Sequence, residues 1–356
     1  LTPGTHIMYN LKDHMFKYID ELKKKYKYLK TEFSISPTTE PDEGELKVFS
    51  QVINNGAKDL HASHLVVGND ADLIVLGMAV KPIYNIDILI RHKSEQSIIS
   101  IKRLIQEHAK KVYIENKGRN MIGLDKKLFL KPSNLRKSTT RVDFAIISIM
   151  MGNDYLPKLK YIKFESIWSA YFGTKCMYRD DDLSLISGEI FNNKFMKSFM
   201  YSLIQILPNQ FRRLVLNQYD EKVVKNYLEG LLWCLNMYST GKCPKYDYVY
   251  EYVSAPSPCD ILYYLEFNPK SCIHVPRSNA EPLSVGACSV LLIPKKVISL
   301  LPQKYQNIML QELSYIYEKE DKLHRPPNSC QYFIIFCWWK HGLQSRIFLL
   351  LCQECK

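Results

Sequence analysis

Short apolar segments of the kind that form strands recur through the first 100 residues of the chain. Residues 64–67 end in an apolar run, and residues 86–90 form a second one. Residues 30–36 alternate polar and apolar side chains, which is the period of a strand with one buried face. Helical patterns lie between these segments. Strands that alternate with helices in this way indicate a parallel sheet.

Four segments carry apolar residues at helical spacing. The first begins at Thr2 and Pro3, which suit an N-cap and a first helical position, and it ends in the lysines at 23–25. The others cover residues 46–55, 97–114 and 142–151, of which the last is almost wholly apolar and is expected to be buried.

Beyond residue 155 the pattern is mostly helical, and residues 233–252 are unusually rich in aromatic side chains. Such rings either pack between subdomains or stack on bases. We therefore predict an α/β domain in residues 1–160, a helical, aromatic-rich extension in residues 161–320, and a divergent C-terminal segment in residues 321–356. No apolar run approaches the roughly 20 residues that span a bilayer, so we expect no membrane partner.

The net charge of +12 favours a polyanionic partner, with nucleic acid first. Basic residues accumulate between Lys102 and Arg141. This stretch is interpreted either as a surface that follows a phosphate backbone or as a solvated linker.

Two aspartates follow the apolar run at residues 64–67. Asp70 and Asp72 stand where a buried strand ends and an apolar helix begins, which is where α/β folds bind ligands. Two neighbouring carboxylates without a basic partner repel each other unless a cation lies between them, and oxygen ligands suit Mg²⁺ or Mn²⁺. The alternative is that both residues cap the helix and face water.

Three further carboxylates come from separate stretches. Glu43 and Glu45 lie at the start of the helix at 46–55, where they either complement the helix dipole or join the aspartates. Asp154 follows the buried helix at 142–151, as either a ligand that points into a cleft or a turn residue.

The order of these motifs resembles the core of the Xrn-type 5′→3′ exoribonucleases. The motifs are PDEGELK at 41–47, GNDADLIVLG at 68–77, DF at 143–144 and GNDYLP at 152–157, followed by the aromatic block at 233–256 and a proline-leucine motif at 294–305. The resemblance extends in the same order over residues 1 to about 310.

The resemblance implies a PIN/FEN-like nuclease domain that removes nucleotides stepwise from single-stranded RNA with a 5′-monophosphate. By motif match, Glu43, Glu45, Asp70, Asp72 and Asp154 are the catalytic ligands of two Mg²⁺ or Mn²⁺ ions, and Lys47 and Asn153 contact the RNA. In the family, further acidic motifs precede the segment that begins at Thr2. The chain therefore resembles a fragment of the catalytic region, and the activity of this chain alone stays open.

Two other functions are compatible with the acidic motifs. A flap-type DNA nuclease shares the carboxylates but lacks the aromatic block and the proline-leucine motif. An RNA-binding relative without catalysis would gain nothing from five carboxylates that repel phosphate. Residues 78–142 contain no cysteine for the zinc knuckle that chiefly nuclear Xrn members carry, which favours a cytoplasmic protein over a nuclear one.

Overall fold

The structure is a computed structural model that describes residues 3–27, 31–92, 95–117, 139–178, 183–208 and 219–314. Contacts divide the chain into two compact units, Glu43–Asn279 and a second unit that joins Leu1–Asp42 to Ala280–Lys356. The domain boundaries predicted at residues 160 and 320 stay predictions. The predicted C-terminal segment 321–356 and the basic residues between 118 and 138 lie outside the described residues.

The main sheet of the unit Glu43–Asn279 has the strand order β1-β2-β3. β1 (His64–Val67) and β2 (Ile86–His92) run parallel, as the alternation of strands and helices predicts. β3 (Glu95–Ser100) runs antiparallel to β2, so the prediction of a parallel sheet is wrong for this strand. The fold is therefore mixed α/β, with a small sheet that is only partly parallel.

The helix predicted over residues 97–114 begins later than expected. Ile98 pairs with Leu89 and Ile99 with Ile88 in the sheet, and α4 (Ile101–Lys117) starts only after β3. The apolar residues of β3 also fit the helical spacing that continues into α4, so the pattern alone merges strand and helix.

α3 (Asp72–Ala79) and α6 (Thr140–Met150) pack against each other in this unit, and α6 confirms the buried helix predicted at 142–151. Arg141 of α6 is fully buried. Its Nε donates to the carbonyl of Met78 at 2.8 Å, and its Nη2 donates to the carbonyls of Gly77 and Val80 at 2.8 and 2.7 Å. These carbonyls end α3 and have no partner within the helix, so Arg141 supplies donors that water cannot. Arg141 is thus part of the core and not of a phosphate-binding surface.

A second buried polar group joins α6 to the helices that follow it. Asp143 accepts a hydrogen bond of 2.7 Å from the Tyr171 hydroxyl and one of 2.8 Å from the backbone N–H of Leu185. The Lys175 ammonium lies 3.5 Å from Asp143 and also donates to the carbonyl of Leu183. Neither charged side chain is exposed, so both depend on these partners. Asp143 thereby fixes α7 (Phe164–Met177) and the hairpin of β4 (Ile186–Ser187) and β5 (Ile190–Phe191).

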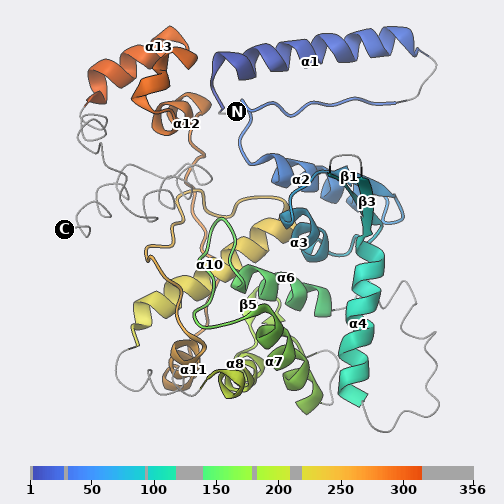
Figure 1. Ribbon diagram of the computed structural model, residues 1–356, viewed down its shortest axis with the longest axis vertical. Coiled ribbons are helices and arrows are strands. Elements are labelled where there is room, and N and C mark those ends of the chain that lie inside the picture. Colours follow the sequence, from blue (N-terminus) through green and yellow to red (C-terminus); the bar gives the residue numbers. More distant parts are fainter. Residues whose placement is uncertain are drawn as a thin grey trace. The chain divides into compact units, whose positions relative to one another are not determined.

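The chain after residue 155 is mainly helical, as predicted. α8 (Asn193–Ile206) packs against α7 and α11 (Pro258–Phe267). α10 (Glu221–Thr240) lies in the middle of the unit and packs against α6, α3, α11 and α2 (Gly44–Lys58) (Figure 1). Trp233, Tyr238 and Tyr248 are at most 8% exposed, so these rings of the aromatic block pack in the core.

The second unit contains α1 (His6–Lys25), α12 (Val285–Leu292) and the short helices η2 (Lys295–Leu300), α13 (Gln303–Asn307) and η3 (Ile308–Glu312). The start of α1 predicted at Thr2 and Pro3 is wrong. Gly4 has a φ of +79°, so the chain turns there and Thr5 becomes the N-cap. The strand predicted at residues 30–36 is also wrong, because residues 31–36 have no strand partner. Among the described helices, none has the length and apolarity needed to cross a bilayer.

Replacing Arg141 tests its role at the end of α3. We expect Arg141→Met to lower the free energy of unfolding by about 3 to 5 kcal/mol, because it leaves three buried carbonyls without donors. The exposed Arg103 on α4 offers a matched control, for which Arg103→Met is expected to change stability by less than about 0.5 kcal/mol. Urea unfolding followed by circular dichroism measures both values. Equal midpoints for the two variants would contradict this role.

His108 of α4 gives a pH-dependent test of the same core. Burial lowers the pKa of His108 to about 4, and its ring packs against Trp168 and Phe144 at centroid distances of 5.5 and 5.4 Å. As pH falls from about 6.5 to 4, the unfolded chain takes up a proton that the folded chain refuses, so His108 lowers stability by up to about 3 kcal/mol.

The variant His108→Phe removes this titration and should lose less stability than the wild type between pH 7 and pH 4.5. His274→Phe, at an exposed position, should keep the wild-type dependence. Urea unfolding at several pH values measures the difference. Parallel pH profiles for wild type and His108→Phe would show that burial does not suppress this protonation.

Candidate functional site

Asp70 and Asp72 lie at the junction of β1 and α3, as the sequence predicts. Asp72 is the first residue of α3, and its backbone N–H donates to Oδ1 of Asp70 at 3.0 Å. One oxygen of Asp70 therefore satisfies a donor at the N-terminus of α3, although the N-cap residue itself is Ala71. Both aspartates are only partly buried.

Glu43 and Glu45 lie at the start of α2. Glu43 is the N-cap residue, and its Oε2 accepts a hydrogen bond of 2.7 Å from the Tyr155 hydroxyl. Burial raises the pKa of Tyr155 well above its usual value, and the charge of Glu43 raises it further. The phenol therefore stays protonated and acts as a donor. Glu45 and Lys47, both half-buried, lie in the first turn of α2.

A second phenol reaches Asp72. The Tyr238 hydroxyl on α10 lies 3.4 Å from Oδ2 of Asp72, and the Asn153 amide donates to the Tyr238 oxygen at 3.3 Å. Burial raises the pKa of Tyr238 well above its usual value, with Asp72 and then Glu43 as further negative charges that raise it. Glu43 and Asp72 thus act on the same phenol, although about 30 residues separate them in the chain.

Asn153 connects the Tyr238 hydroxyl to the backbone of Tyr155. Its side-chain oxygen accepts from the backbone N–H groups of Tyr155 and Leu156 at 3.0 and 2.8 Å, while its amide nitrogen donates to Tyr238 and lies 3.7 Å from the sulfur of Cys234. Asp154, between Asn153 and Tyr155, is half-buried. We refer to Asn153, Tyr155 and Tyr238 as the phenol-amide network. It joins the loop after α6 to Glu43 and Asp72.

Rings of the aromatic block pack against this network. Trp233 contacts Tyr155 edge to face at 5.2 Å, stacks on Tyr248 at 5.1 Å and donates its indole N–H to the carbonyl of Lys245. Gly241 ends α10 with a φ of +67°, and a Cβ there would lie 2.8 Å from the Cα of Ser50 in α2. This close approach brings Tyr238, one turn before the end of α10, to the helix that carries Glu43.

The five predicted carboxylates are therefore only partly assembled. The network links Glu43 to Asp72, and a hydrogen bond links Asp72 to Asp70, while Glu45 and Asp154 adjoin this group in the chain. Among the described residues, no three acidic, histidine or cysteine side chains lie close enough together to hold a metal ion. The oxygen donors suit a hard cation such as Mg²⁺, but the described carboxylates do not compose a complete coordination sphere.

Tyr155 and Tyr238 are members of the site that sequence reasoning missed. Tyr155 lies within the GNDYLP motif at 152–157, and Tyr238 lies within the aromatic block. In the first motif only the acidic and amide residues are predicted to be functional, and the aromatic block is interpreted as packing or base-stacking rings. A hydrogen bond from a phenol to a carboxylate far away in the chain leaves no periodic signal.

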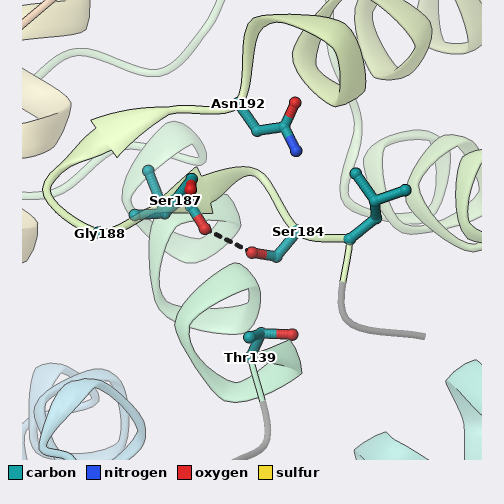
Figure 2. Close-up of a pocket in the computed structure, with 7 residues that line it drawn as sticks. Thr139, Ser184, Ser187, Gly188 and Asn192 are labelled. Atoms are coloured by element: carbon teal, nitrogen blue, oxygen red, sulfur yellow. Dashed lines mark hydrogen bonds between the residues drawn. The ribbon is translucent and has the colours of Figure 1, made fainter. Parts of the chain in front are cut away.

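A separate pocket of about 360 Å³ lies at the hairpin of β4 and β5. Figure 2 shows Thr139, Ser184, Ser187 and Asn192 around it, with the Ser184 hydroxyl donating to the carbonyl of Ile186. None of the predicted site residues lines this pocket, and its hydroxyl groups show no feature of a catalytic group.

Two family models match the chain. The model of the XRN 5′-3′ exonuclease N-terminus matches residues 1–92, and the model of the Xrn1 helical domain matches residues 210–323. The chain belongs to the Xrn-type 5′→3′ exoribonuclease family. The Xrn N-terminal match contains Glu43 and Asp72, and the Xrn helical match contains Tyr238, so the phenol-amide network joins the two matched segments. No curated protein matches the chain.

Removing the Tyr155 hydroxyl tests the network. We expect Tyr155→Phe to lower the free energy of unfolding by about 1.5 kcal/mol, because it removes a hydrogen bond to a charged group. Tyr201, which is 57% exposed, provides the matched control, and Tyr201→Phe should change stability by less than about 0.5 kcal/mol. Chemical denaturation measures both variants. A Tyr155→Phe variant as stable as the control would mean that this hydrogen bond contributes nothing.

Proposed function

We propose that this protein is a divalent-metal-dependent 5′→3′ exoribonuclease that hydrolyses single-stranded 5′-monophosphate RNA stepwise to mononucleotides in RNA turnover. The observation that carries the proposal is that Glu43 and Asp72, from two acidic motifs of the Xrn N-terminal region, meet at one phenol-amide network. The mixed sheet with its carboxylates beyond β1 is compatible with a PIN/FEN-like domain.

We propose Glu43, Glu45, Asp70, Asp72 and Asp154 as the carboxylates that face the metal, with two Mg²⁺ or Mn²⁺ ions as the cofactor. Nucleases of this family depend on divalent metal ions. Such an ion, when bound, polarises a phosphate and lowers the pKa of a water molecule. The chain's own residues supply negative charge and help to fix its position, because the hydroxyls of Tyr155 and Tyr238 hydrogen-bond to Glu43 and Asp72.

Lys47 and Asn153 are the proposed RNA contacts, and the structure supports this role better for Lys47 than for Asn153. The half-buried Lys47 lies one turn after Glu43 on α2, from where its ammonium can approach a phosphate. The Asn153 side chain makes hydrogen bonds through both of its polar atoms. A positioning role between the two phenols therefore fits Asn153 better than a direct RNA contact.

A cytoplasmic location is part of the proposal and rests on the sequence alone. Residues 78–142 contain no cysteine for a zinc knuckle.

The variant Asp72→Asn tests the proposed activity. Mononucleotide release from a short 5′-monophosphate RNA in Mg²⁺ should fall by a factor of about 100 or more, since the amide removes a negative charge from the reacting centre. Asp247, an exposed carboxylate that accepts from the Ser278 hydroxyl, provides the control, and Asp247→Asn should keep the wild-type rate. Removing Mg²⁺ with EDTA should stop the reaction in the wild type and in Asp247→Asn.

The choice of substrates separates the alternatives. Faster cleavage of branched DNA than of RNA would replace the proposal with a flap-type nuclease. Salt-dependent RNA binding without turnover in Mg²⁺ or Mn²⁺ would indicate a binding protein that lacks catalysis. Equal rates on 5′-monophosphate and 5′-hydroxyl RNA would contradict only the selection of the 5′ end.

A further inference from the structure

An open pocket of about 570 Å³ lies between α4 and α7 and is lined mainly by aromatic rings. Phe144, Trp168 and Phe172 form its walls, together with Phe164, whose side chain is 61% exposed. Trp168 and Phe172 are near parallel, with an interplanar angle of 30° and a centroid distance of 5.9 Å. None of the five proposed metal-facing carboxylates lines the pocket, so it is separate from the site already described.

Gly173 is an exposed glycine that lines the pocket. It lies within α7, where glycine costs about 1 kcal/mol relative to alanine, and a Cβ there would meet no atom within 4 Å. By contrast, Gly56, Gly77 and Gly230 lie in helices where a Cβ would approach a side chain to 2.3, 2.8 and 2.6 Å. Packing therefore explains those three glycines but not the exposed Gly173, where the absence of a side chain leaves room beside the other lining residues.

The rim of the pocket carries a cation. The Lys111 ammonium lies 4.7 Å from the centroid of the Phe172 ring, and Lys111 itself is exposed. Lys102, Arg103 and Lys110 are exposed on the same helix, and Lys110 pairs with Glu107. Glu165 is the acidic residue of the lining. A flat ring that carries an anion suits a surface of aromatic rings with the Lys111 ammonium at its edge.

We propose that this pocket binds one unpaired nucleotide of RNA, with the base against the half-buried Trp168 and the exposed Phe164 and a phosphate on Lys111. The proposal rests on RNA being the substrate of this protein, and it adds a contact outside the carboxylate site. Aromatic rings stack on any base, so the pocket selects single strands and not sequence. A duplex keeps its bases stacked on each other and cannot use it.

The binding assay uses wild-type protein and an adenylate decamer with a 5′-hydroxyl end and a 3′ fluorophore, in EDTA, with fluorescence anisotropy as the readout. A Cβ at Gly173 meets no atom within 4 Å, so Gly173→Leu adds a side chain beside the pocket lining, and we expect the dissociation constant to rise about fivefold or more. Gly173→Ala is the matched control, because a methyl group is too small to fill the pocket. Its dissociation constant should stay within about twofold of wild type.

Charge and base contacts are tested separately. Lys111→Gln should weaken binding more than Lys110→Gln, which removes the same charge one residue away from the lining. An abasic decamer should bind wild type as weakly as the adenylate decamer binds Gly173→Leu. Equal affinities of wild type and Gly173→Leu, with unchanged circular dichroism and unfolding midpoints, would overturn the proposal.

Two further outcomes distinguish this proposal from its neighbours. Quenching of tryptophan fluorescence by an aromatic peptide, blocked in Gly173→Leu while RNA binding is unaffected, would overturn it in favour of a peptide site. Failure of the Mg²⁺-dependent turnover would remove the proposed function but not this readout, because the binding assay contains neither metal nor a 5′-monophosphate.

Discussion

The buried C-terminal end of α3 is the constraint on which the rest of the larger unit depends. α3 is short and almost wholly apolar, and its last carbonyls point into a region that water does not reach. Arg141 answers this demand with three hydrogen bonds from a fully buried guanidinium. The negative end of the helix dipole takes the place of a carboxylate partner for the cation. Burial lowers the pKa of Arg141 to about 9, so it still carries its charge at neutral pH.

This contact also decides where the candidate chemistry lies. Asp72 is the first residue of α3, and Arg141 of α6 donates hydrogen bonds to carbonyls at the other end of α3. The position of the Asp72 carboxylate therefore depends on how α3 is held against α6. The loop after α6 then returns to the same place through Asn153 and Tyr155. Two segments that are distant in the chain thus meet at Glu43 and Asp72 because one helix is fixed at both ends. The end of α10 at Gly241 packs closely against α2, which brings Tyr238 to the same group of residues.

The sequence predicts those parts of the fold that have a period and an amino-acid signature. β1 and α6 are found at nearly their predicted bounds, and the mainly helical character of the later chain follows from the pattern. β3 is missed because its isoleucines continue into the spacing of α4. The N-terminal helix is predicted too early because Thr2 and Pro3 match capping preferences, whereas Gly4 turns the chain. For the site, the acidic motifs and their order are readable. The phenols of Tyr155 and Tyr238 and the buried Arg141 are not, since each acts through tertiary contacts.

An eight-residue helix such as α3 is too short to be stable by itself in water. Its shape therefore depends on a side chain that follows it by about 60 positions in the chain. A nascent polypeptide in which the acidic motifs at 41–47 and 68–77 have just left the ribosome would still lack the Arg141 guanidinium that holds α3. The proposed metal-facing carboxylates Asp70 and Asp72 consequently reach this geometry only after the chain has been synthesised as far as Arg141, and until then the growing chain presents their motif without an organised centre.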